Sequence, residues 1–465
     1  MLKKISCKLF LARLIFIFCL ALFSIASALY LMKNRRAVSP GVNIVLICID
    51  TLRADHLPFY GYDLNTAPFL TELASKSAVF DKAYTVWSAT TPSVASLFTS
   101  LYPFQHGVFR GFSFFKRAEI KADEKSVTRQ VDALSGSYKT LAEVLKEQGY
   151  KTYGISDNVN VNKEMGFARG FDEFVFRSYD SASTISEILI DLKKEIVQAG
   201  KYFLYIHFMD PHAPYYKRMP WFSEFARKRE LDENDSNQVA KYSPGGPWDP
   251  FKAVAYDSEI RYLDEWIGNL FETFQWDHNT LFILIADHGE EFWEHGRTDH
   301  NKTLYNEVLH IPMMVYYSEG GISGKRISQN VSIIDILPTL ANFSGSGKDK
   351  KYEGIDLLPM IKGKTEKARK LFAVLNFKPK NRYLKSTIYK EWKYISTWGE
   401  GEELFNLETD FGEKENLTGK YPQRAAQMLE WYDDNEKNCE KYLTESSEYE
   451  MTKSKMEHLK SLGYL

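Results

Sequence analysis

A run of five apolar residues, Leu281 to Ile285, ends abruptly in Asp287, His288 and Gly289. An unbroken apolar run bounded by polar residues predicts a strand that is buried on both faces, as in a parallel sheet. Ligands bind just beyond the carboxyl ends of such strands, which is where Asp287 and His288 fall. A carboxylate beside an imidazole indicates a metal site for an anionic ligand. A helix-capping aspartate with surface histidines is the plain alternative.

A second buried strand is predicted over residues 43–50, NIVLICID, and it ends at Asp50. If this strand and the one before Asp287 are both central and parallel, their carboxylates converge at one edge of the sheet. Two carboxylates that meet there are what a divalent cation requires.

The segment from Thr90 to Ser93 predicts a loop that enters a helix, because Pro92 suits a first helical turn. A helix N-terminus binds anions, and a hydroxyl placed there can bind a metal and act as a nucleophile. The alternative is a threonine–serine pair that only caps the helix.

The N-terminal segment differs in composition from the rest. Residues 14–32 are uncharged and mostly apolar, and as a helix they would span about 28 Å, close to the hydrocarbon core of a bilayer. Basic residues on both sides favour an uncleaved membrane anchor over residues 1–36, with a linker over 37–42 and the body outside the cytoplasm, on the periplasmic or extracellular side. A secretion signal cleaved at Ala26-Ser27-Ala28 is the alternative.

The charge of the remaining chain excludes nucleic acid as a partner. Residues 1–36 hold seven basic and no acidic residues, which leaves 52 basic against 61 acidic residues in the body and a net charge of −9. Such a body has no basic surface for nucleic acid. The four cysteines show no disulfide framework.

Several blocks of sequence carry a family resemblance. NIVLICIDTLRADHLPFYGY, TPSVASLFTSLYPFQHG and IADHGEEFWEHG, in this order, resemble the sulfatase branch of the alkaline phosphatase superfamily. Later blocks such as SIIDILPTLANFSG and EELFNLETDFGEKENL extend the resemblance over nearly the whole chain after residue 42. It implies an α/β fold: an α/β/α sandwich with a mostly parallel sheet (43–370), then a small C-terminal α+β domain with an antiparallel sheet (371–465).

The sequence agrees with this fold on its own terms. Buried strands are predicted over 202–208 and 311–317, with helical patterns between them, which is an α/β order. A long helix is predicted from Ala255, with one apolar stripe facing the core. After about residue 370 the pattern predicts hairpin strands, and the last 15 residues predict a terminal helix.

Carried over to this sequence, the resemblance makes Asp50, Asp287 and His288 metal ligands. It places Thr90 at the nucleophile, where its hydroxyl would also bind the metal. With an imidazole among the ligands, one divalent ion is expected, and Zn²⁺ or Mn²⁺ suits the site better than Ca²⁺ or Mg²⁺.

The resemblance also implies roles for histidines. His212, in FMDPHAPYY, is implied as a contact to substrate oxygens. His300 is implied as a second contact to substrate or metal, because it stands 12 residues beyond His288, as in the phosphoethanolamine and lipoteichoic-acid transferase relatives. His295 is a further candidate for substrate binding. For His207, packing beneath a loop is the preferred interpretation.

The sequence departs from a working sulfatase at the nucleophile. Such an enzyme carries Cys or Ser, any residue, Pro, Ser and Arg, and its first residue is oxidised to formylglycine; here residues 90–94 are TTPSV. Oxidation of threonine would give a ketone, and Val94 replaces the arginine. The lysine–histidine pair that grips sulfate is also missing near Gly154, where the sequence is ISDNVN. The route through a hydrated aldehyde is therefore closed.

Three functions stay open at this point. The first is metal-dependent hydrolysis or transfer of a phosphoester, especially a phosphodiester, through Thr90. The second is hydrolysis of sulfuric esters without formylglycine, and the third is a non-catalytic relative that binds a glycan or a partner. The expected partner is an anionic ester, for which an enzyme facing outward would find envelope glycans or lipids. Residues 215–251, too long for a simple connection, predict a lid that selects the substrate, with a solvated insertion as the alternative.

Overall fold

The computed structural model describes residues 41–112, 130–232, 234–235, 238, 249–322, 324–347, 349–377, 382–440, 447–450 and 457. The predicted anchor lies outside these residues, as do nearly all of the predicted terminal helix and much of the predicted lid. Among the residues that are described, no helix has the length and apolarity that a membrane span requires. Residues 41–465 form one compact unit.

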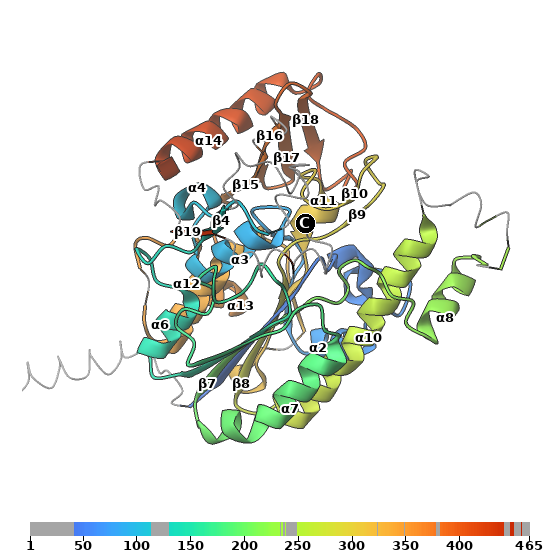
Figure 1. Ribbon diagram of the computed structural model, residues 1–465. Helices are drawn as coiled ribbons and strands as arrows, with labels where there is room; N and C mark the ends of the chain where they lie inside the picture. Colours follow the sequence, from blue (N-terminus) through green and yellow to red (C-terminus); the bar gives the residue numbers. More distant parts are fainter. Residues whose placement is uncertain are drawn as a thin grey trace, which may run out of the picture. The chain divides into compact units, whose positions relative to one another are not determined.

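The body is organised by a large sheet (Figure 1). In the described residues this sheet has eight strands in the order β13-β2-β12-β8-β1-β7-β5-β6. Strand β1 (Asn43–Ile49) lies between β7 (Tyr202–Phe208) and β8 (Thr280–Ala286) and runs parallel to both. Every residue of β7 and β8 is buried, which confirms that their apolar runs are strands covered on both faces.

The remaining strands of the sheet flank this centre. Parallel strands β5 and β6 extend it on one side, and on the other side β12 pairs antiparallel with β8. The predicted mostly parallel sheet is therefore confirmed. The bounds are β2 (Ala78–Phe80), β5 (Lys151–Ser156), β6 (Glu173–Phe176), β12 (Met313–Tyr316) and β13 (Lys325–Ile327).

Helices cover both faces of the sheet, as Figure 1 shows. Helices α2, α7 and α10 pack together on one face, and α3, α6 and α12 on the other. The predicted apolar stripe of α10 is buried, although the helix begins five residues before the expected Ala255. The bounds are α2 (Pro68–Ala74), α3 (Thr90–Thr99), α6 (Leu141–Glu147), α7 (Ala182–Gln198), α10 (Pro250–Phe274) and α12 (Ile336–Ser344).

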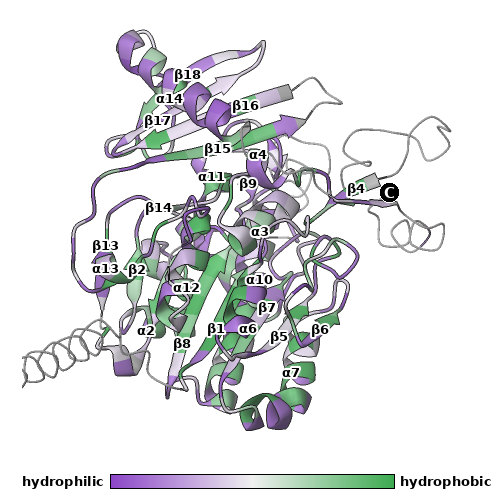
Figure 2. Ribbon diagram, turned by 90° about the vertical axis from the view of Figure 1, so that its left-hand side faces the viewer, coloured by the Kyte–Doolittle hydropathy of each residue, from purple (hydrophilic) through white to green (hydrophobic). Residues whose placement is uncertain are grey.

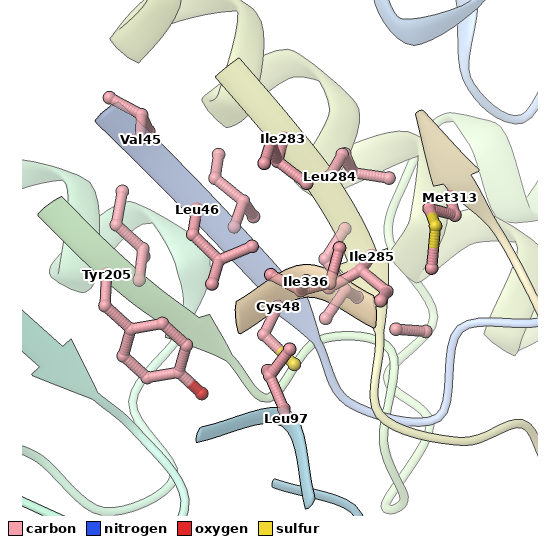
Figure 3. Close-up of a cluster of buried hydrophobic side chains, with 14 of the residues drawn as sticks. Val45, Leu46, Cys48, Leu97, Tyr205, Ile283, Leu284, Ile285, Met313 and Ile336 are labelled. Atoms are coloured by element: carbon pink, nitrogen blue, oxygen red, sulfur yellow. The ribbon is translucent and has the colours of Figure 1, made fainter. Parts of the chain in front are cut away.

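The core lies between the central strands and these helices. Leu97 of α3 and Ile336 of α12 lie over Cys48 of β1 and Ile285 of β8, and all four are fully buried (Figure 3). Figure 2 shows the same contrast along the chain, with hydrophobic residues on β1 and β8 and hydrophilic ones along the outer helices. Dense packing of this kind holds the ends of the central strands in fixed positions.

A second, antiparallel sheet forms the C-terminal part, as the resemblance implies. Its described strands follow one another as a meander, and α14 (Pro422–Glu440) packs on one face. Buried Lys393 forms an ion pair with Glu413 at 2.7 Å, and its Nζ also donates to Asn306 Oδ1 at 3.0 Å, which connects this sheet to the segment after β8. The strands are β15 (Lys370–Phe377), β16 (Arg382–Tyr389), β17 (Trp392–Thr397) and β18 (Gly401–Asn406).

Short elements complete the described fold. Strand β4 pairs antiparallel with β19, so residues near the C-terminus lie beside residues 130–133. The short helices are α4 (Pro103–His106), α8 (Trp221–Lys228), α11 (Asn306–Leu309) and α13 (Leu358–Ile361). The short strands are β3 (Ala83–Tyr84), β4 (Gln130–Ala133), β9 (Glu291–Phe292), β10 (Thr298–Asp299), β11 (His310–Ile311), β14 (Val331–Ser332) and β19 (Ser447–Glu450).

Candidate metal centre and active site

Three predicted ligands meet at the carboxyl edge of the central strands. Asp50 follows β1, and Asp287 and His288 follow β8; the register pairs Ile49 with Ala286, so the two strands end level. One ligand atom from each of the three residues lies within 4.8 Å of the others. His288 Nε2 is 3.7 Å from Asp50 Oδ1 and 3.5 Å from Asp287 Oδ2. All three side chains are fully buried.

The carboxylates of this cluster are arranged to receive a cation. Asp287 Oδ1 accepts the backbone N–H groups of Thr51 and His288, at 3.3 and 2.8 Å, which orients Oδ2. Asp50 Oδ1 and Asp287 Oδ2 are buried and find no hydrogen-bond partner within the described parts of the chain. Uncompensated buried carboxylates are costly, so two oxygens and an imidazole nitrogen fit a divalent metal ion.

The charges of the two carboxylates influence each other. Burial raises the pKa of Asp287 well above its ordinary value, and the charge of Asp50 adds to the effect. At Asp50 burial acts in the same direction, but the neighbouring His212, His207 and His288 outweigh it and lower the pKa. Repulsion from Asp50 thus disfavours a charged Asp287, and a cation bound between the two carboxylates would relieve it.

Thr90 presents its hydroxyl to the same cluster. It is the first residue of α3, and Oγ1 lies 3.3 Å from Asp50 Oδ2 and 3.4 Å from His288 Nε2. The partial positive charge at the N-terminus of a helix favours an anion at this place. The structure thus brings the predicted nucleophile to the predicted ligands.

Asn158 belongs to the cluster but was not among the predicted site residues. It follows β5, is buried, and its Nδ2 donates to Asp50 Oδ2 and lies 3.4 Å from Thr90 Oγ1. Its Oδ1 accepts the backbone N–H of Asn160 at 2.7 Å, so the amide orientation is set. The available signal was its place just beyond the end of a parallel strand.

The structure corrects the interpretation of His207. Packing beneath a loop was expected, yet the residue lies inside β7 and its Nε2 is 3.5 Å from Asp50 Oδ2. Its Nδ1 bonds the Tyr205 hydroxyl at 2.8 Å. This fully buried imidazole therefore lies directly beside the first predicted ligand and lines the metal cluster.

His300 lies beside the predicted ligand His288, and His212 lies beside His300. The ring of His300 is centred 4.5 Å from that of His288 and 5.2 Å from that of His212. His212 Nδ1 contacts the carbonyl oxygen of Ala213 at 2.6 Å. The three imidazoles therefore form a continuous group that could contact the oxygens of an ester bound at Thr90.

His295 does not join this group. Its ring stacks on Tyr305 at 3.7 Å, Nδ1 contacts Glu307 Oε1 at 2.6 Å, and Nε2 lies 3.0 Å from the carbonyl oxygen of Glu413. Both ring nitrogens thus bond to protein groups at the junction with the C-terminal sheet. This geometry gives His295 a structural role, and the expectation of a substrate contact finds no support in it.

The first part of the predicted lid packs against the body beside His212. Arg218 donates to Asp210 at 2.9 Å and to Glu259 at 2.7 Å, and α8 buries Phe222 and Phe225 against α10. A pocket opens here, lined by His212 together with Tyr179, Tyr216 and Arg218 among others. The described part of 215–251 is therefore a wall next to the candidate site.

Asp157 gives a stability prediction near the site. Burial raises the pKa of its carboxyl to about 8; the backbone N–H of Asp180 opposes this shift and the charge of Asp210 adds to it. From about pH 4 to 8 the folded protein retains a proton that the unfolded chain has lost, so stability falls as pH rises, by at most about 1.4 kcal/mol per pH unit. Asp157→Asn removes this loss, so its melting temperature is expected to match wild type below about pH 4 and to exceed it by an amount that grows up to about pH 8. A difference in melting temperature that does not change with pH would contradict this pKa.

Comparison with known proteins identifies the family. The sulfatase family model matches residues 42–346. The chain belongs to the sulfatase family. A second model, that of the C-terminal part of N-sulphoglucosamine sulphohydrolase, matches residues 293–436 of this sulfatase-family protein.

Similar proteins agree with this assignment. The ulvan-active sulfatase of Formosa agariphila is 22% identical in an alignment 419 positions long, which covers 81% of this chain and 77% of that protein. The Delta 4,5-hexuronate-2-O-sulfatase of Bacteroides thetaiotaomicron is 26% identical over 169 residues, but the match spans only 34% of each chain. A solved structure of the phosphonate monoester hydrolase of Agrobacterium radiobacter has a TM-score of 0.63 at 17% identity and covers 85% of this chain and 96% of that one. This structural match shows that the two proteins share a fold. The alkaline-phosphatase-like α/β/α architecture is therefore confirmed.

The family assignment fixes the general chemistry. The protein is a hydrolase of the sulfatase family, and enzymes of this family use a divalent metal. The cluster of Asp50, Asp287 and His288 offers the ligands for one.

Proposed function

We propose that this enzyme hydrolyses or transfers a phosphoester, and in particular a phosphodiester, with Thr90 as the nucleophile. The observation that carries the proposal is the position of the Thr90 hydroxyl, at the N-terminus of α3 and 3.3 and 3.4 Å from Asp50 and His288. A hydroxyl that meets a buried ligand cluster is placed for attack on an ester bound there.

Asp50, Asp287 and His288 would hold the metal, with the Thr90 hydroxyl beside it. The metal would lower the pKa of a hydroxyl and neutralise charge on the ester oxygens. Because one ligand is an imidazole, Zn²⁺ or Mn²⁺ suits the set better than Ca²⁺ or Mg²⁺.

The side chains divide the reaction between them. The Thr90 hydroxyl gives its proton to solvent and its oxygen forms a bond to phosphorus, while the bond from phosphorus to the leaving alcohol oxygen breaks. His212 and His300 contact the substrate oxygens, and one of these two imidazoles gives a proton to the departing alcohol oxygen. Water or a second alcohol then attacks phosphorus, the bond from phosphorus to the Thr90 oxygen breaks, and the proton lost by the attacking group restores the Thr90 hydroxyl. Asn158 holds the orientation of Asp50 through its amide.

Sulfuric esters are the second candidate substrates, because the similar proteins include sulfatases. Two features of this chain oppose the usual sulfatase chemistry: Thr90 cannot become formylglycine, and Val94 is fully buried where an arginine would be needed. A non-catalytic glycan-binding role is disfavoured by Asp50 Oδ1 and Asp287 Oδ2, whose burial without a described partner is costly unless a cation binds.

The place of action follows from the N-terminal sequence. Residues 14–32 have the length and apolarity of an anchor, with cleavage as a secretion signal as the alternative. Either leaves the enzyme outside the cytoplasm, where anionic esters of envelope glycans or lipids are within reach. No role with nucleic acid is proposed, because the body is acidic.

A substrate panel tests the proposal. The full chain, loaded with Zn²⁺ or Mn²⁺, is assayed with 4-nitrophenyl phosphodiesters, phosphomonoesters and sulfate esters. We expect the highest kcat/KM for a phosphodiester, and loss of this activity after removal of the metal by a chelator. A sulfate ester as the best substrate would overturn the phosphoester proposal and favour the second candidate.

A further inference from the structure

Glu290 is a fully buried carboxylate that the proposed chemistry does not use. Two hydrogen bonds of 3.0 Å hold the Glu290 backbone. Its N–H donates to the Glu307 carbonyl, and the Glu290 carbonyl accepts from Arg53 Nη1. The preceding Gly289 allows this close approach, because a Cβ there would lie 2.0 Å from the Glu307 oxygen. The direction of the Glu290 side chain is therefore fixed by the fold.

Both carboxylate oxygens of Glu290 have defined partners. Oε1 lies 3.0 Å from His300 Nδ1, and Oε2 accepts the Tyr215 hydroxyl at 2.8 Å. The two partners come from different loops, one after β10 and one after β7. One buried carboxylate thus connects two loops that the sequence separates widely.

Each of these loops carries one of the two candidate substrate histidines. His300 lies 4.5 Å from the ring of His288 and 5.2 Å from that of His212. Tyr215 stands three residues after His212, at the start of the predicted lid. The hydrogen bonds from His300 and Tyr215 to Glu290 therefore hold both loops in place on the side of the metal centre where the leaving group would be.

We propose that Glu290 is a positioning residue whose carboxylate orients the His300 ring and, through Tyr215, holds the loop that carries His212. An imidazole can rotate about its side-chain bonds, and a hydrogen bond from Nδ1 to a carboxylate fixes the plane and the direction of its other edge. Glu290 acts through His300 and does not touch the substrate. The proposal rests on the proposed function, since the orientation of His300 matters to turnover only if the ester reacts at Thr90.

Glu290→Gln is the informative variant because it keeps the volume of the side chain. A glutamine has one acceptor oxygen and places an NH2 donor where the carboxylate had its second acceptor, so one of the two hydrogen bonds must be lost or reverse its direction. The matched control is Glu291→Gln. Glu291 is also buried and adjacent, but its Oε1 accepts the Thr303 hydroxyl at 2.9 Å, where the corresponding oxygen of Glu290 bonds His300.

The experiment compares the full-length, metal-loaded variants with wild type. We expect Glu290→Gln to lower kcat by about 10- to 100-fold, the usual effect of losing a partner that orients a functional imidazole, with KM and metal content little changed. The loss is expected to be larger for an alkyl than for a 4-nitrophenyl phosphodiester, because the poorer leaving oxygen depends more on His300. Glu291→Gln is expected to keep wild-type kcat.

A double variant separates positioning from a general structural effect. If Glu290 acts through His300, adding Glu290→Gln to His300→Ala causes little further loss. The proposal is overturned if Glu290→Gln has wild-type kcat, if it affects both esters equally, or if its full loss persists in the His300→Ala background. A failure of the proposed function gives a different result. Thr90→Ala would then retain turnover, whatever the result at Glu290.

Discussion

Thr90→Ala is expected to reduce turnover of the best phosphoester by several orders of magnitude, since loss of a covalent nucleophile removes the reaction and not only binding. The hydroxyl lies at the N-terminus of α3 next to Asp50 and His288, and alanine leaves no atom there to attack phosphorus. Metal content is expected to fall only modestly, because Asp50, Asp287 and His288 remain. Steady-state kinetics and metal analysis of the same preparation measure both effects.

Two substitutions at the same position serve as controls. Thr90→Ser keeps a hydroxyl and should retain part of the phosphoester activity. Thr90→Cys should not give a strong sulfatase even beside a formylglycine-generating enzyme, because Val94 stands where the motif needs arginine. If Thr90→Ala keeps wild-type turnover, the nucleophile lies elsewhere and the mechanism is wrong.

Asp287→Asn and Asp50→Asn are expected to abolish metal binding. Each removes one of the two buried carboxylates, leaving a neutral amide in a three-residue ligand set. With metal at 100 times its Kd, wild type is stabilised by about 2.7 kcal/mol, which the variants lack. Their melting temperatures should therefore lie below that of metal-loaded wild type, and chelator should lower the melting temperature of wild type alone.

Asp264→Asn is the matched control for these variants. Asp264 is also buried, but it accepts the backbone N–H groups of Phe69 and Leu70 at the start of α2, away from the metal cluster. It should change the melting temperature without changing the metal content. Wild-type metal content in Asp50→Asn or Asp287→Asn would show that the ligand assignment is incorrect.

The strands that build the site could be predicted because their apolar runs indicate buried strands. Strands β1 and β8 are buried apolar runs, each followed by an aspartate, and β7 is an apolar run that only His207 interrupts. The convergence of Asp50 and Asp287 follows from parallel strands that end level, and the register confirms it.

Residues that enter the site across the sheet were harder to predict. Asn158 follows β5, two strands from β1, and the order of strands in a sheet cannot be read from chain order. His207 lies within an apolar run, so its pattern is that of a core residue. Its position beside Asp50 depends on the pairing of β1 with β7, which only the structure gives.

His295 was placed near the substrate because it follows His288 closely in sequence, and this role stays a prediction. It stands seven residues after His288, but the short hairpin of β9 and β10 turns the chain between them. The side chain then stacks on Tyr305 and bonds Glu307 instead of the substrate side. Local spacing cannot show the direction in which such a hairpin points.

The central position of β1 also determines when this strand can pair during synthesis. This strand is made early, but its partners β7 and β8 are encoded much later in the chain. At 5–20 residues per second, residue 286 leaves the peptidyl-transferase centre roughly ten to fifty seconds after residue 49. During that interval the edge of β1 that pairs with β8 has no partner, and until β7 is made the other edge has none either; unpaired edges favour association with other chains. The metal centre can therefore form only when most of the chain exists, and the nascent protein needs protection from aggregation until then.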